Sequence, residues 1–118
     1  MSVATAQVCE GRLKLALQPI RDSYDFIIID CPPSLSLLTL NALAAADGII
    51  VPMQCEYFAL EGLNSLINTI NALKQKLNPG LEIDGIVRTM YDVRNNLANA
   101  VSNELTTHFG DTVYRTLV

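Results

Sequence analysis

The chain has 118 residues, half of them hydrophobic, and a formal net charge of −4. This length suits one domain, and so large an apolar fraction excludes a disordered segment. No apolar stretch reaches the roughly 18–20 residues needed to span a bilayer. The first residues lack a basic start followed by an apolar segment, so no secretion signal is expected and a cytosolic protein is predicted. The net negative charge excludes a surface that is positively charged throughout, but it is compatible with a local basic patch.

Four segments carry apolar residues at helical spacing, and they predict helices over residues 5–21, 35–45, 60–77 and 95–109. Four short apolar or β-branched runs predict strands over residues 25–30, 48–51, 81–90 and 112–118. Pro52 is expected to end the second strand, Asn95 or Asn96 to cap the last helix, and Gly110 to follow that helix. Strands alternating with helices predict a single α/β domain over residues 1–118, with a parallel sheet flanked by helices.

The most informative stretch is the apolar run at residues 26–29, which ends at Asp30. An unbroken apolar run fits a strand buried on both faces, and Asp30 would lie at its carboxyl end, where open α/β sheets bind ligands. Pro32 and Pro33 force the chain out of the sheet, and Ser34 can cap the next helix. One carboxylate in this place suits a hydrated Mg²⁺ beside a phosphate. The alternative is that Asp30 only ends a strand and leads into a helix.

The three cysteines are Cys9, Cys31 and Cys55. An odd number without a C-x-x-C pair indicates reduced thiols rather than a disulfide, zinc or cluster framework. Buried structural cysteines are therefore expected.

A family resemblance rests on three segments. Residues 24–43, YDFIIIDCPPSLSLLTLNAL, resemble the Walker-B-type strand and switch region of the ParA/Soj partition ATPases. These belong to the deviant-Walker-A branch of P-loop proteins, together with MinD and the nitrogenase iron protein. The resemblance continues through residues 51–63, VPMQCEYFALEGL, and residues 88–97, RTMYDVRNNL, and so covers nearly the whole chain. It implies a P-loop NTPase-like fold and a role in ATP-dependent segregation of chromosomes or plasmids.

One part of such a site is missing from the sequence. A hydrolysing P-loop needs clustered glycines followed by a lysine, and none of the six glycines here precedes a lysine. The resemblance implies that this loop and its strand precede the part seen here and that a further segment follows Val118. The chain is therefore expected to be a carboxyl-terminal part that lacks the P-loop strand, binds no cofactor and is inactive alone. Its Asp30 strand should keep an unpaired edge and an exposed apolar face, which invites self-association or another strand.

The resemblance also implies roles for single residues. Asp30 would be catalytic and contact Mg²⁺ through a water, and Pro32 and Pro33 would form the nucleotide switch. Thr89 and Met90 would lie near the nucleotide base. The alternatives are a turn and helix cap for Pro32, Pro33 and Ser34 and core packing for Met90.

Arg94 matches an arginine that the family associates with sequence-independent DNA binding, and a solvated surface arginine is the alternative. Asp92 is expected to fix the loop or cap a turn, and His108 to interact with the last carbonyl groups of its helix. The intact family protein would use Mg²⁺ and ATP, dimerise, coat nucleoid DNA in the cytoplasm and respond to a ParB-type partner, without binding membrane. Two alternatives stay open: a MinD-like division-site regulator, whose carboxyl-terminal amphipathic helix is not seen here, and a non-catalytic interaction module.

Overall fold

The computed structural model describes residues 10–32, 34 and 36–118. The chain divides into two compact units, which are described separately. The sheet unit comprises residues 48–72 and 82–118, and the helical unit comprises residues 1–47 and 73–81. The single domain over residues 1–118 remains a prediction.

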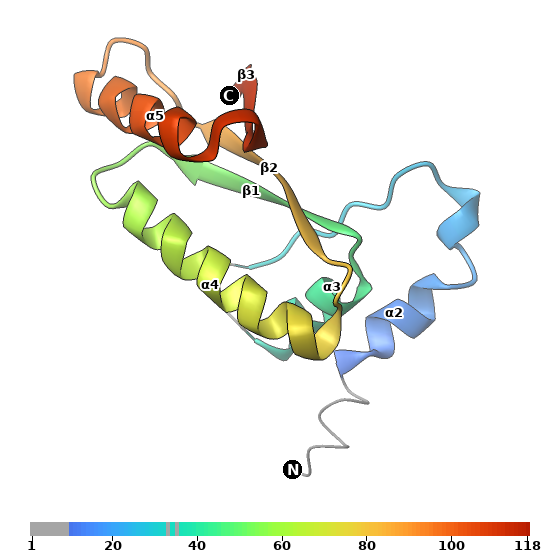
Figure 1. Ribbon diagram of the computed structural model, residues 1–118. Coiled ribbons are helices and arrows are strands. Elements are labelled where there is room, and N and C mark those ends of the chain that lie inside the picture. The colour runs from blue at the N-terminus through green and yellow to red at the C-terminus, as the bar shows by residue number, and fades with distance from the viewer. Residues whose placement is uncertain (1–9, 33, 35) are drawn as a thin grey trace. The chain divides into compact units, whose positions relative to one another are not determined.

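The sheet unit contains three parallel strands in the order β1-β2-β3 (Figure 1). They are β1 (Gly48–Gln54), β2 (Glu82–Thr89) and β3 (Val113–Leu117). The connections contain α4 (Ala59–Leu77), α5 (Asn96–Phe109) and the short 3-10 helix η2 (Gly110–Thr112). The parallel α/β sheet flanked by helices is thereby confirmed, with three of its four predicted strands in the ladder.

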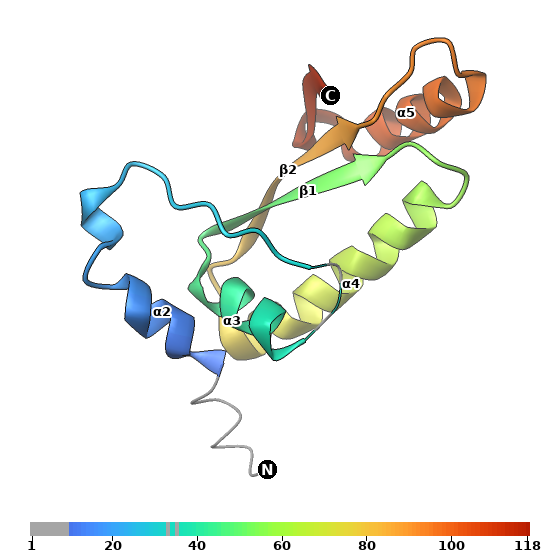
Figure 2. The ribbon, with the colours of Figure 1, turned by 180° about the vertical axis from the view of Figure 1, so that it is seen from behind.

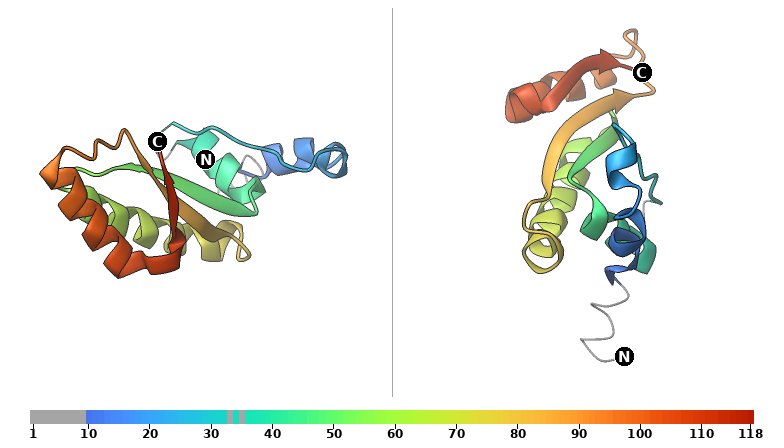
Figure 3. Two further views of the ribbon diagram at one scale, coloured as in Figure 1. Left: turned by 90° about the horizontal axis from the view of Figure 1, so that it is seen from above. Right: turned by 90° about the vertical axis from the view of Figure 1, so that its right-hand side faces the viewer.

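The core of the sheet unit lies between the strands and the helices α4 and α5 (Figure 3). Its buried members come from all five elements: Val51, Leu63, Ile86, Leu105 and Val113. Alternation along β1 directs Val51 into this core, whereas Ile50 on the other face is 58% exposed. Strand β1 is therefore buried on one face only, because α4 and α5 pack on the face that carries Val51.

Strand β1 also runs further than predicted. It continues through Pro52 to Gln54, and Pro52 pairs in register with Val87 of β2. In the described sheet β1 is an edge strand, so a missing N–H on its outer side costs no ladder hydrogen bond. Proline is therefore tolerated here and does not end the strand.

Both ends of α5 follow the sequence prediction. Asn95 is the N-cap, and its side-chain oxygen accepts hydrogen bonds from the backbone N–H groups of Leu97 and Ala98 at 3.0 and 3.3 Å. Gly110 ends the helix with φ of 50°, a conformation that favours glycine.

The helical unit contains α2 (Arg12–Leu17), the 3-10 helix η1 (Arg21–Ser23) and α3 (Leu37–Ala45) (Figure 2). The helix expected over residues 5–21 is thus shorter, with residues 1–9 outside the described part. Asn78 closes the end of α3: its Nδ2 donates to the carbonyl oxygens of Leu43, Ala44 and Ala46 at 3.2, 3.4 and 2.7 Å. These bonds occupy carbonyl groups that the end of a helix leaves without partners.

The strand predicted over residues 25–30 is wrong. Residues 24–32 form neither helix nor strand, and Phe26 and Ile28 are 87% and 92% exposed. A strand needs a neighbouring ladder, and the described residues of the helical unit contain no strand to pair with it. The apolar side chains of this segment were expected to be exposed to solvent, and those of Phe26 and Ile28 are. None of the described helices combines the length and apolar character needed to cross a membrane.

Candidate functional site

The loop after β2 is held in place by bonds at both of its ends. The Tyr91 backbone N–H donates to the carbonyl oxygen of Val118 at 3.0 Å, which ties the loop to the end of β3. The Tyr91 hydroxyl also donates to Asn99 Oδ1 on α5, and Asn99 Nδ2 donates to the carbonyl oxygen of Val93 at 2.8 Å. Two bonds through Asn99 therefore fix residues 91–93 against the first turns of α5, directly before Arg94.

Arg94 is joined to Asp92 by three hydrogen bonds. Its Nε and Nη2 donate to Oδ1 and Oδ2 of Asp92, each at 3.0 Å, and its backbone N–H donates to Oδ1 at 2.9 Å. The Arg94 side chain is 88% exposed. The side-chain bonds from Arg94, followed by the backbone bond, lower the pKa of Asp92. The loop thus presents a fixed guanidinium whose charge is balanced by one carboxylate, and Asp92 fixes the loop as expected.

Thr89 and Met90 stand at the carboxyl end of β2, next to the end of β1. Thr89 pairs in register with Gln54, whose Nε2 lies 3.4 Å from Met90 Sδ. Met90 has φ of 51° and is 77% exposed. A non-glycine residue in this region carries backbone strain, and such strain clusters at functional sites. Core packing does not explain Met90, because its side chain lies open at the sheet edge where α/β proteins bind ligands.

Asp30 belongs to the helical unit and is exposed. It follows the exposed segment and precedes Pro32, which is also exposed, while Pro33 lies outside the described residues. Thr89, Met90 and Arg94 belong to the sheet unit: Thr89 ends β2, Met90 follows it, and Arg94 lies on the loop before α5.

The donor chemistry decides which metal could suit Asp30. Within the described part of the chain, no group of three or more His, Cys, Asp or Glu side chains is arranged as a metal site. A lone exposed carboxylate cannot enclose a cation. It does suit Mg²⁺, which keeps several waters and takes its remaining ligands from phosphates.

The cysteines differ from one another. Cys55 is buried beside Ala98 and Val101, as predicted, and burial raises the pKa of its thiol. Cys31 is exposed, so its predicted burial is wrong, because it follows the segment that lies outside any ladder. Cys9 is outside the described residues.

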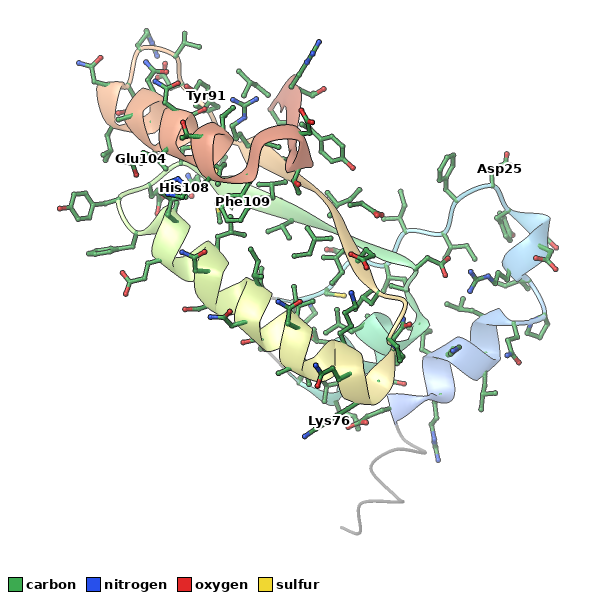
Figure 4. The ribbon with its side chains drawn as sticks, in the orientation of Figure 1. Asp25, Lys76, Tyr91, Glu104, His108 and Phe109 are labelled. Atoms are coloured by element: carbon green, nitrogen blue, oxygen red, sulfur yellow. The ribbon has the colours of Figure 1, made fainter. Side chains whose placement is uncertain are left out.

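His108 does not bond to the last carbonyl groups of α5, so the expected interaction with them is wrong. Its Nδ1 lies 2.8 Å from the carbonyl oxygen of Glu104, one turn earlier on α5 (Figure 4). The sequence analysis missed Asn99. Its only signal is an amide residue four positions after the Asn95 cap, which places it on the same side of the helix as the loop.

Comparison with known proteins shows the family of the chain. Residues 1–83 match the family model AAA_31, described as an AAA domain. The chain is 55% identical to the chromosome partitioning protein ParA of Myxococcus xanthus, over 92% of this chain and 38% of the relative. It is 51% identical to the sporulation initiation inhibitor protein Soj of Bacillus subtilis, over 92% of this chain and 43% of the relative. The chain therefore spans about two-fifths of the length of these curated relatives.

Solved structures share the fold. A cobyrinic acid a,c-diamide synthase from Mycobacterium smegmatis, with a bound ATP analog and magnesium, superposes with a TM-score of 0.76 at 40% identity. That match covers 86% of this chain and 41% of the other. A plasmid partition protein from Borrelia burgdorferi superposes with a TM-score of 0.70 at 32% identity, over 88% of this chain and 42% of the other.

Proposed function

Because the chain belongs to the AAA domain family, in which it is of the ParA/Soj type, we propose that it is part of an ATPase that segregates chromosomes or plasmids. The observation that supports this most directly is the 55% identity to a chromosome partitioning ParA over 92% of the chain. The exposed Arg94, on a loop whose backbone is held by Asn99, adds a feature of the sheet unit that suits contact with a phosphate backbone.

In this proposal the nucleotide is bound by the intact protein, to which this chain contributes several residues. When bound, Mg²⁺ and ATP supply the phosphoryl chemistry, which depends on positioning and charge neutralisation. The Asp30 carboxylate would help to hold the hydrated cation, and Pro32 and Pro33 would stiffen the segment that follows it. Thr89 and Met90 lie beside the base. The chain alone holds no glycine-rich lysine loop, so we expect neither tight nucleotide binding nor hydrolysis by the 118 residues alone.

We assign Arg94 to sequence-independent contact with DNA phosphates. A guanidinium on a rigid loop can bind a phosphate without reading the bases. One arginine on an acidic chain binds weakly, so the ATP-bound form would act as a dimer that presents two such loops on the nucleoid. A ParB-type partner would then trigger hydrolysis.

The test measures retention of the intact protein, with its glycine-rich loop, on random-sequence DNA with and without ATP. Asp30→Ala should abolish the ATP dependence, and ATP turnover at the normal rate by that variant would refute the role of Asp30. Arg94→Ala should weaken retention equally for all sequences and flatten its salt dependence. Binding to lipid vesicles in place of DNA would identify the MinD-like alternative. Failure of the intact protein to bind ATP would identify the interaction module.

We also propose that the apolar segment around Phe26 and Ile28 associates with another strand or a second copy of the chain. Both side chains are almost fully exposed, and the backbone beside them is unpaired. Sedimentation of the 118-residue chain should show association that Ile28→Asp reduces. A monomer at all concentrations would contradict this proposal.

A further inference from the structure

We propose that Asp92 competes with DNA phosphate for Arg94 and thereby sets the strength of DNA binding. This inference rests on the proposed contact between Arg94 and DNA. It starts from the two parallel bonds at 3.0 Å that join Nε and Nη2 of Arg94 to the two carboxylate oxygens. A phosphate uses the same paired geometry when it binds arginine.

The pair leaves only part of the guanidinium for a second anion. Arginine has five N–H donors, and Asp92 takes two of them on the edge that includes Nε. A phosphate must either displace the carboxylate from that edge or bind the remaining edge with a second negative charge close by. Both routes weaken binding, since like charges a few ångströms apart repel even in water.

Along this stretch of the sequence no neighbouring residue can balance either charge. Between Arg88 and Glu104 the sequence has only two charged residues, Asp92 and Arg94. Both are solvent-accessible, and exposed ion pairs are held weakly, so a phosphate can exchange with the carboxylate. Asn99 holds the adjoining backbone, so this exchange leaves the loop in place.

The decisive variant is Asp92→Asn. The asparagine oxygen can still accept the Arg94 backbone N–H, and asparagine favours the same local turn, so the loop keeps its shape while the charge is lost. The matched control is Glu104→Gln, which changes the net charge equally on an exposed face of α5. We would titrate the ¹⁵N-labelled 118-residue chain with a short random-sequence duplex at low salt, following the backbone amides of residues 93–97 by NMR.

We expect Asp92→Asn to bind about threefold or more tightly than the original chain, which is the scale of one like-charge repulsion at about 6 Å in water. Its salt dependence should be steeper, Arg94→Ala should cancel the gain, and Glu104→Gln should change affinity less than twofold. If Asp92→Asn binds equally or more weakly while Arg94→Ala binds poorly, Asp92 is not a competitor and the inference is overturned. If Arg94→Ala binds as well as the original chain, the proposed DNA contact itself fails. Asp92→Ser repeats the test should the asparagine variant not fold.

Discussion

Replacing Asn99 with alanine should release the loop that carries Arg94. The change removes the bond from the Tyr91 hydroxyl and the bond to the Val93 carbonyl oxygen. Each intramolecular hydrogen bond stabilises a folded protein by about 0.5–1.5 kcal/mol net, so the two together predict a loss of about 1–3 kcal/mol. The variant also gains helix propensity, because alanine favours a helix interior by about 0.6 kcal/mol over asparagine.

Asn103→Ala is the control that removes this second effect. Asn103 is exposed on the same helix one turn later, so its replacement gains the same propensity without losing the two loop bonds. The difference between the free energies of unfolding of the two variants, measured by urea denaturation, should therefore be about 2 kcal/mol. Tyr91→Phe removes only the hydroxyl and should account for part of it. A difference below about 0.5 kcal/mol would show that the loop does not depend on Asn99.

Three further predictions follow from the burial and charge of single side chains. Leu105→Ala should lower the free energy of unfolding by about 2–5 kcal/mol in urea denaturation, because the side chain is fully buried in the core of the sheet unit. Iodoacetamide at pH 8 should label the exposed Cys31 in the folded chain and should label Cys55 only after unfolding, because Cys55 is buried and burial raises the pKa of its thiol. Peptide mass spectrometry measures the labelling rate at each cysteine, and equal rates in the folded chain would contradict the burial of Cys55. Arg94 holds the pKa of Asp92 below its usual range. The ion pair between the two residues therefore contributes fully to stability above the ordinary aspartate pKa of about 3.9, and this contribution is lost as the pH falls through the lower pKa of the folded state. The NMR chemical shift of the Arg94 Nε–H should stay constant from pH 7 to about 5 and change below pH 4. A change near neutral pH would contradict the lowered pKa of Asp92.

Local sequence features were sufficient to predict those parts of the fold that depend on neighbouring residues. Periodicity identified α4 and α5, the Asn95 cap and the Gly110 helix end followed from residue type, and the parallel sheet followed from the alternation of strands and helices. Those features depend on contacts within a few residues or on an apolar face that must be covered. Asp30, Thr89, Met90 and Arg94 were chosen by motif, and their functional roles remain proposals.

Tertiary contacts decided the rest. The apolar run before Asp30 has the composition of a buried strand, but a strand exists only if a neighbour supplies its hydrogen bonds. The pairing of Arg94 with Asp92 and the clamp through Asn99 depend on where a loop meets a helix, which no spacing in the sequence specifies. The sequence by itself thus determined the family, the alternation of helices and strands in the sheet unit and the ends of α5, because these are carried by local pattern. Only the folded chain decided which surfaces stay open and which charges meet, because those depend on the elements that pack beside them.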